Sequence, residues 1–251
     1  MATSLPDYVM KRVRREPSCS CIVKGSTPVV AFGDPRKAFA ATLGLNPSRV
    51  EFQDGCARLL DGEERRLATL DSLGLRCLPN ATKRHVESIL KDCENYFHRN
   101  PYRRWFDQLE PLLNAMGASY YDATACHLDL VQWATDPTWG KLSPADRKLM
   151  LSEDVLFLIE QLRNEQIELL LLNGMGVVRQ FQRHLDVVLS EASPIDHGGY
   201  QPTRLFTGVL FGHVQVVGWS TNIQSSFGVT RERRKQLVER IRVSGRHLRE
   251  K

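Results

Sequence analysis

The chain has 251 residues and a net charge of +5, with 42% hydrophobic and 25% charged residues, a composition ordinary for a globular protein. No apolar stretch reaches the roughly 18–20 residues that span a bilayer, and residues 1–18 have no apolar core before their charges, which excludes a secretory signal. We therefore expect a cytoplasmic protein whose six cysteines are reduced thiols. Cys19 and Cys21 could begin a metal site, but no second close pair follows, so no metal and no cofactor are expected.

The first half of the chain begins with two apolar runs that predict strands, over residues 28–34 and 38–45. The second of these runs ends at Asn46-Pro47. Helical spacing of apolar residues follows over 63–75 and 82–97, and Pro101 begins another predicted helix, which Gly117 ends. A short run with strand composition occupies residues 119–128.

The second half repeats this alternation. A long helix is predicted over 142–166 with Ser143 as its N-cap, then a buried strand over 167–174 and a helix over 175–189. A loop over 193–202 leads to two strands, 203–212 and 213–220, and the last helix covers 229–245 with Thr230 as its cap. This order predicts an α/β fold with three layers, α/β/α, around a mostly parallel central sheet.

The chain has no internal repeat and no low-complexity linker, which predicts one domain over residues 1–251. Within it, residues 1–26 are expected to be a basic N-terminal extension and the core to cover about 28–242. In such folds ligands bind beyond the carboxyl ends of the strands. The segments expected there are 43–48, 120–126, 169–176 and 216–226.

These segments resemble the motifs of the uracil-DNA glycosylase superfamily, in its broad sense, over roughly residues 28–242. The family's first motif, Gly-x-Asn-Pro after a strand, is Gly44-Leu45-Asn46-Pro47 here. Phe52, followed seven and eight residues later by Leu59-Leu60, is similar to a family phenylalanine and its leucine pair. The chain departs from the family in two places: Asp122 stands where an Asn reads the base, and no His precedes Ser220 in the last motif.

The resemblance implies a monofunctional DNA glycosylase, which flips a base, hydrolyses its N-glycosidic bond and leaves an abasic site. Asn46 would orient the attacking water through its amide oxygen, and the carbonyl of Pro47 would hold the same water. Phe52 would stack on the flipped base, with Tyr121 closing the pocket. An alternative interpretation stays open, in which Asn46-Pro47 only shapes a turn and Phe52 is an ordinary core residue.

Asp122 carries the expectation about the base. An ionised carboxylate only accepts hydrogen bonds, so it suits the amino group of cytosine and repels the corresponding carbonyl of uracil. Because removal of plain cytosine would destroy the host genome, we expect a modified cytosine. Some glycosylases of the superfamily resemble phage-defence enzymes that remove glucosylated hydroxymethylcytosine from phage DNA, so the resemblance implies this base and a role in antiviral defence. Excision of uracil in base excision repair stays open, as does a role for Asp122 in capping a turn.

The expected partner is double-stranded DNA, bound by a monomer. Basic clusters at 11–15 and in the last helix suit a polyanion, and hydroxyl and amide groups beside them can bind phosphates. The DNA-binding candidates are Ser48, Ser220, Thr221, Asn222, Gln224, Arg231 and Arg234. Two rival functions stay open, a non-catalytic relative that binds modified DNA and a hydrolase of free nucleosides or nucleotides.

Overall fold

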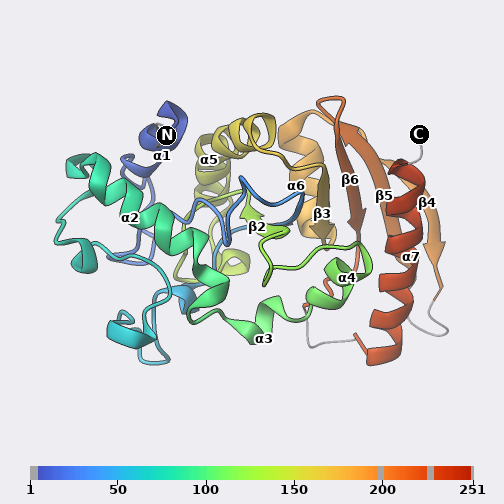
Figure 1. The fold of residues 1–251 in the computed structure, drawn as a ribbon, viewed down its shortest axis with the longest axis horizontal. Coiled ribbons are helices and arrows are strands. Elements are labelled where there is room, and N and C mark those ends of the chain that lie inside the picture. Colours follow the sequence, from blue (N-terminus) through green and yellow to red (C-terminus); the bar gives the residue numbers. More distant parts are fainter. Residues whose placement is uncertain (1–4, 197–200, 225–228, 250–251) are drawn as a thin grey trace. The chain divides into compact units, whose positions relative to one another are not determined.

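The structure is a computed structural model that describes residues 5–196, 201–224 and 229–249. Figure 1 shows its helices and strands. The strands are β1 (Ala40–Gly44), β2 (Ala125–Asp129), β3 (Leu169–Asn173), β4 (Ser190–Ile195), β5 (Thr203–Leu210) and β6 (Val214–Trp219). The α-helices are α1 (Asp7–Val13), α2 (Lys83–Glu94), α3 (Arg103–Phe106), α4 (Glu110–Ala115), α5 (Pro144–Asn164), α6 (Met175–Leu185) and α7 (Arg231–Arg249). None of the helices in these ranges is long and apolar enough to cross a membrane.

The six strands form one mixed sheet in the order β2-β1-β3-β6-β5-β4. Strands β1, β3 and β6 run parallel, whereas β5 pairs antiparallel with both β6 and β4. β3 reads LLLLN and is buried along its whole length, as expected of a central parallel strand. The predicted α/β fold with a mostly parallel sheet is confirmed.

Helices cover both faces of the sheet. A Cβ added to Gly218 of β6 would lie 2.9 Å from Val178 of α6, so this face packs closely against α6. The next residue, Trp219, points to the opposite face because side chains alternate along a strand, and α7 packs against β6. This arrangement agrees with the predicted three layers.

The chain is organised in two compact units, each assembled from three separate segments. Unit 1 comprises Met1–Asp34, Leu45–Tyr102 and Leu128–Asn164, and unit 2 comprises Pro35–Gly44, Arg103–His127 and Glu165–Lys251. Each unit is described by itself below. A single domain over residues 1–251 stays a prediction.

Several predicted elements are confirmed together with their caps. Ser143 Oγ accepts a hydrogen bond from Asp146 N at the start of α5, and Thr230 Oγ1 accepts one from Arg233 N in α7. Thr82, expected to be the first residue of the helix over 82–97, is instead the N-cap of α2 and accepts a hydrogen bond from its backbone. The hairpin of β5 and β6 turns at Gly212, whose φ is 78°. The caps were readable because the cap side chain and the helix it serves are adjacent in sequence.

Other elements differ from the prediction. Residues 28–34 form no strand of the sheet, and the only helical elements within residues 63–75 are short 3₁₀ turns. The helix predicted after Pro101 is divided into α3 and α4, because Pro111 stands at the start of α4 and cannot donate a backbone hydrogen bond. β4 was not predicted and occupies part of the expected loop over 193–202.

The expected basic extension is also different in part. Residues 7–13 form α1, which packs against α5 inside unit 1 and buries Val9, Arg12 and Val13. Two cations of the 11–15 cluster pair with a buried carboxylate, as described below, so they are not available to a polyanion.

Candidate functional site

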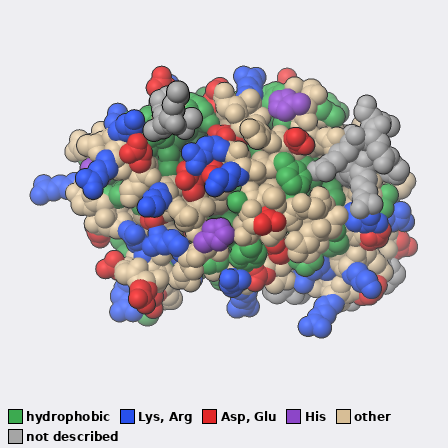
Figure 2. Space-filling view, viewed as in Figure 1, with side chains coloured by type: hydrophobic (Ala, Val, Ile, Leu, Met, Phe, Trp, Pro, Cys, Tyr) green, Lys and Arg blue, Asp and Glu red, His purple; other side chains and the backbone are tan. Residues whose placement is uncertain are grey.

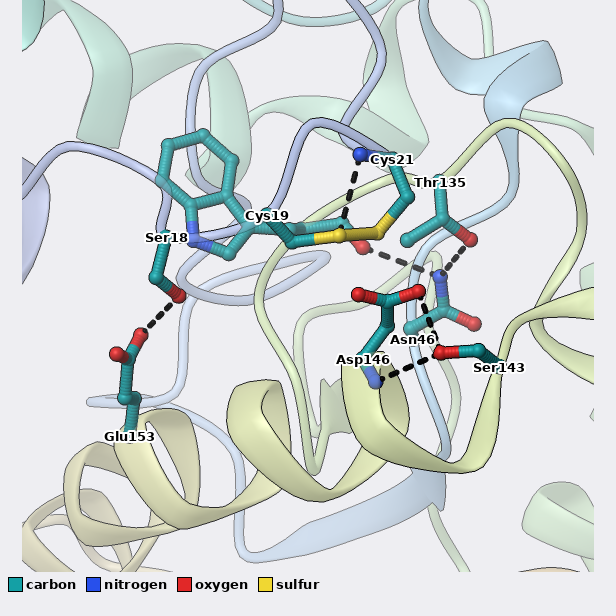
Figure 3. Close-up of a disulfide and its surroundings, with 9 residues drawn as sticks. Ser18, Cys19, Cys21, Asn46, Thr135, Ser143, Asp146 and Glu153 are labelled. Carbon is teal, nitrogen blue, oxygen red and sulfur yellow. Dashed lines mark hydrogen bonds between the residues drawn. A yellow bond between two sulfur atoms is a disulfide. The ribbon is translucent and has the colours of Figure 1, made fainter.

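Asn46 of unit 1 lies in the loop after β1, two residues beyond the end of that strand. The two N–H groups of its Nδ2 are shared among three acceptors, the carbonyl of Pro47 at 3.0 Å, the carbonyl of Trp133 at 3.1 Å and Thr135 Oγ1 at 3.1 Å. Figure 3 shows the amide beside Thr135. The side chain is half-buried, and among the described residues its Oδ1 accepts no hydrogen bond. The amide nitrogen is therefore fixed, and the oxygen is left as an acceptor.

Ser48 continues this loop. Its hydroxyl accepts a hydrogen bond from Val50 N and caps the 3₁₀ turn Arg49–Glu51, and its side chain is exposed. Pro47 is buried. The carbonyl oxygen of Pro47 has two lone pairs, and one of them accepts the hydrogen bond from Asn46 Nδ2. The loop thus offers two acceptor positions next to each other, Oδ1 of Asn46 and the second lone pair of Pro47.

Two of the acceptors that hold Asn46, on Trp133 and Thr135, lie in the loop after β2, and Gln132 anchors that loop. Its backbone N–H donates to Asp154 Oδ2 at 3.1 Å, its Nε2 donates to the carbonyl of Asp129 at 2.8 Å, and its Oε1 accepts from Arg12 Nε at 3.0 Å. The guanidinium of Arg12 also lies 5.0 Å from the centre of the Trp133 ring. One glutamine therefore connects α1, α5 and the loop that orients Asn46.

Asp154 is the charged centre of this network. It is 1% exposed and pairs with Arg12 at 3.1 Å and with Arg15. Burial lowers the pKa of Arg12 to about 10, while Asp154 acts in the opposite direction. Arg12 therefore remains charged at neutral pH, and the buried carboxylate has two cationic partners.

Asp122 does not lie at the carboxyl end of a strand, and this predicted position is wrong. It stands in a turn before β2, where its Oδ1 accepts from Thr124 N at 2.9 Å and from the Thr124 hydroxyl. The following residue, Ala123, has a φ of 64°. These are the contacts of an Asp that caps a tight turn, which is the alternative left open above.

The carboxylate that does end β2 is Asp129, which the sequence analysis missed. Asp129 is 4% exposed, and the loop that follows it pairs with the Asn46 loop, since Val131 N donates to the carbonyl of Leu45 at 3.0 Å. The sequence pattern that could have identified Asp129 is the segment after Ala125, in which His127 and Asp129 alternate with apolar residues, as in a strand.

Glu51 and Phe52 follow Asn46 by five and six residues in the sequence. Phe52 is a core side chain with 1% of its surface exposed. Glu51 is also buried and accepts a hydrogen bond from the hydroxyl of Tyr96 at 2.6 Å. Burial raises the pKa of Glu51 to about 7; the Tyr96 hydrogen bond and Arg66 lower it, and the charge of Asp129 raises it. Glu51 is thus a second group that the sequence analysis did not select, and its proton exchanges near neutral pH.

Tyr121 belongs to unit 2, in the same turn as Asp122. Its hydroxyl donates to Asp107, and the guanidinium of Arg103 lies 4.9 Å from its ring centre. Burial raises the pKa of Tyr121 to about 12, and the hydrogen bond to Asp107 acts in the same direction. Tyr121 is therefore a neutral phenol at physiological pH.

The polar loop after β6 in unit 2 is organised by Asn173, the last residue of β3. Its Oδ1 accepts from Trp219 Nε1 and Ile223 N, both at 3.0 Å. Its Nδ2 donates to Asn222 Oδ1 at 2.9 Å and Gln224 Oε1 at 2.8 Å. This residue was part of an expected segment but was not singled out, and its four hydrogen bonds fix the loop.

Most of the predicted DNA-binding side chains of unit 2 have partners within the unit. Ser220 Oγ accepts from Arg204 N, Thr221 bonds to Thr203, and Arg234 donates to the carbonyl of Ile223 at 3.3 Å. Asn222 is exposed, and so is Arg231 at the first turn of α7. Residues 225 and 226, expected in the same loop, lie outside the described residues.

The cysteines provide a further correction. Cys19 and Cys21 form a disulfide in unit 1, so these two are not reduced thiols. Cys56, Cys77, Cys93 and Cys126 are free. One residue separates Cys19 from Cys21 in the sequence, and nothing in that spacing distinguishes a disulfide from a dithiol.

The charge on the visible face of the molecule is mixed. Figure 2 shows Lys and Arg side chains dispersed among acidic and neutral ones. Part of the formal charge of +5 therefore sits beside compensating carboxylates, as Arg204 does beside Glu191 and Arg242 beside Glu239.

The arrangement in unit 1 brings together an oriented amide oxygen, a buried carboxylate at a strand end and a carboxylic acid that titrates near neutral pH. Such a set can position a water molecule and accept hydrogen bonds from a polar ligand. Comparison with known proteins supplies no further assignment: the sequence matches no protein-family model and no curated protein.

Proposed function

We propose that the protein is a monofunctional DNA glycosylase that hydrolyses the N-glycosidic bond of a flipped base. The observation that carries this proposal is the geometry of Asn46, whose nitrogen is held by three oxygens while its Oδ1 has no partner among the described residues. A water that donates to Oδ1 and to the second lone pair of Pro47 would be oriented for attack on the sugar. Asn cannot act as a base, so the departing base must be stabilised as well.

Hydrolysis without a covalent intermediate follows from the residue type. A Schiff-base lyase needs an amine nucleophile, and the position after β1 is occupied by Asn46 rather than Lys. The glycosidic bond therefore breaks with water as the nucleophile, and the product is an abasic site in intact DNA.

For the base, we assign to Asp129 the role expected of Asp122. It has the same side chain, it stands at the carboxyl end of β2 and its loop pairs with the Asn46 loop. Its carboxylate would accept from the amino group of a cytosine derivative, with one proton shared between the carboxylate and the ring nitrogen. Glucosylated hydroxymethylcytosine in phage DNA is the proposed substrate, and antiviral defence the proposed role.

Double-stranded DNA is the proposed partner, bound by a monomer. Among the DNA-binding candidates, the exposed ones are Ser48 in unit 1 and, in unit 2, Asn222 and Arg231. The proposed location is the cytoplasm, since four of the six cysteines are free thiols and free thiols persist in reducing compartments.

The test is an excision assay on matched duplexes that contain uracil, cytosine, hydroxymethylcytosine or glucosylated hydroxymethylcytosine, followed by hot alkali to cleave abasic sites. We expect cleavage only at a modified cytosine, lost in Asn46→Ala and altered in Asp129→Asn. Asp122→Asn is the matched control, because an amide oxygen can accept the two hydrogen bonds that Thr124 donates to Asp122 Oδ1.

The outcomes separate the rival functions. Cleavage at uracil would retain the glycosylase and reject the assignment of Asp129. Tight DNA binding without cleavage of any duplex would favour a binding protein, and hydrolysis of free nucleosides without salt-dependent DNA binding would favour a nucleoside hydrolase.

A further inference from the structure

The segment Cys19-Ser20-Cys21 of unit 1 lies against the first turn of α5, beside Asp146. One carboxylate oxygen of Asp146 and the two Sγ atoms all lie within 4.8 Å of one another. Figure 3 shows the two sulfur atoms and the Asp146 carboxylate close together. Two sulfur ligands and one carboxylate converge here from two elements that are more than a hundred residues apart in sequence.

The disulfide contributes little to holding this segment. The two cysteines are two positions apart in sequence, and the chain-entropy contribution of a disulfide decreases as the loop that it closes becomes shorter. The backbone holds the segment independently, since Val23 N donates to the carbonyl of Ala134 at 2.9 Å and Asp136 N donates to the carbonyl of Cys21 at 2.9 Å. The three side chains therefore stay together when the disulfide is reduced.

We propose that the reduced thiols of Cys19 and Cys21, together with Asp146, form a binding site for a thiophilic divalent cation such as Zn²⁺. Zinc is bound tetrahedrally by thiolate sulfur at about 2.3 Å and carboxylate oxygen at about 2.0–2.2 Å, which separates two thiolate ligands by about 3.8 Å. The Cα atoms of the two cysteines are 5.2 Å apart, so the sulfur atoms reach this separation by rotation of the side chains.

The surroundings fit a site with three protein ligands and an open position. Cys19 is buried, whereas Cys21 and Asp146 are half-buried, which leaves one side for water. Ser143 Oγ donates to Asp146 Oδ2 at 2.7 Å and orients the carboxylate, as outer-shell groups do in metal sites. Asp146 also lies in the first turn of α5, where the helix dipole favours anions.

The chemistry has two balanced steps. A phosphine reductant and water convert the disulfide into two thiols and the phosphine oxide. Zn²⁺ then binds as both thiols ionise, with release of two protons. Oxidation of the two thiolates to the disulfide would remove two of the three ligands, so metal binding and the disulfide exclude each other.

The site is connected to Asn46 by the backbone. Thr135 forms isolated bridges with Ile22 on one side and with Ser48 on the other, and its hydroxyl accepts from Asn46 Nδ2. The Cys19–Cys21 segment is thus separated from the Asn46 loop by one extended stretch of chain. This inference does not depend on the proposed glycosylase activity, because metal binding is measured directly.

The test uses the full-length protein in two forms, oxidised and reduced with a phosphine. Zinc chloride is titrated in competition with a chromophoric chelator, and cobalt is substituted to observe thiolate-to-metal charge-transfer absorption. We expect one equivalent of metal bound by the reduced protein and none at this site by the oxidised protein. Cys21→Ser should abolish binding, Asp146→Asn should weaken it at least tenfold, and Cys56→Ser, at an exposed free cysteine, should leave it unchanged.

Equal binding by the oxidised and reduced forms, or by Cys21→Ser and the parent protein, would overturn the proposal. The comparison of redox forms requires no substitution, so it remains decisive if a variant fails to fold. Failure of the excision assay together with stoichiometric zinc binding would reject only the proposed function.

Discussion

Asn46 of unit 1 and Asn173 of unit 2 are both asparagines at the exit of a parallel strand, and they use their amides differently. Asn173 fills both sides of its amide, with two donors on its oxygen and two acceptors on its nitrogen. Asn46 fills only its nitrogen side. A saturated amide has no capacity for a ligand and serves to hold the chain, whereas a half-used and oriented amide can bind a reactant. Hydrogen-bond saturation, rather than residue type or strand position, distinguishes the two.

The largest expected effect comes from removing the support of the Asn46 region. Asp154→Ala leaves the buried Arg12 without its charged partner and Gln132 N without its acceptor, so we expect the free energy of unfolding to fall by about 3–5 kcal/mol. Asp154→Asn, which keeps an acceptor oxygen, should lose less. Chemical denaturation of both variants and the parent protein measures this, and an Asp154→Asn variant as stable as the parent would show that the charge contributes nothing.

A second prediction concerns Glu51 and the pH dependence of the free energy of unfolding. The pKa of Glu51 is raised from 4.5 to about 7 by burial. Below pH 4.5 its carboxyl is protonated in both the folded and the unfolded state. Between these two values the unfolded chain releases the proton and the folded protein retains it, so the free energy of unfolding falls by roughly 3 kcal/mol as pH rises towards 7.

Glu51→Gln keeps an acceptor for the Tyr96 hydroxyl and removes the titration. The part of the pH dependence between pH 4.5 and 7 that Glu51 causes should therefore disappear in this variant, which would become more stable than the parent protein at pH 8. Denaturation curves at several pH values test this, and parallel pH profiles for both proteins would contradict the raised pKa.

A third prediction addresses the saturated amide. Asn173→Ala leaves Trp219 Nε1 and Ile223 N buried without an acceptor, and we expect a loss of about 2–4 kcal/mol in the free energy of unfolding. Asn173→Asp keeps the acceptor oxygen but places carboxylate oxygens against Asn222 Oδ1 and Gln224 Oε1. Thermal unfolding compares the two, and a neutral Asn173→Ala would contradict the structural role.

The smallest expected effect on stability is that of Asn46→Ala. The side chain is half-buried and water can replace its donors, so we expect a loss of about 1 kcal/mol. The same substitution should abolish excision in the assay described above. A loss of stability as large as that of Asn173→Ala, without an effect on excision, would make Asn46 a second structural amide and remove the contrast between the two.

Features that depend on neighbouring residues were predictable from the sequence. The strand before Asn46, the buried strand β3, the hairpin at Gly212 and the caps of α5 and α7 all follow from local patterns. Asn46 itself was selected because a strand and a turn are adjacent in sequence, although its free oxygen could not be predicted.

The remaining features depend on contacts between distant residues or on local conformation that several sequences can adopt. The strand expected over 119–128 begins only at Ala125, because the preceding residues form a turn in which Ala123 adopts a positive φ. Because the strand begins later than predicted, the carboxylate at its end is Asp129 and not Asp122. The pairing of Arg12 with Asp154 spans 142 residues, and no local pattern reports it.

The division of the chain into two interleaved units has a consequence for folding. The polypeptide passes from one unit to the other after Asp34, Gly44, Tyr102, His127 and Asn164. No single cut releases either unit as a continuous segment, so neither can be produced alone by simple truncation. Each must wait for segments that are synthesised much later, and such non-local assembly is intrinsically slow. During translation the Asn46 loop therefore remains without its partners until the chain has passed Val131, Trp133 and Thr135.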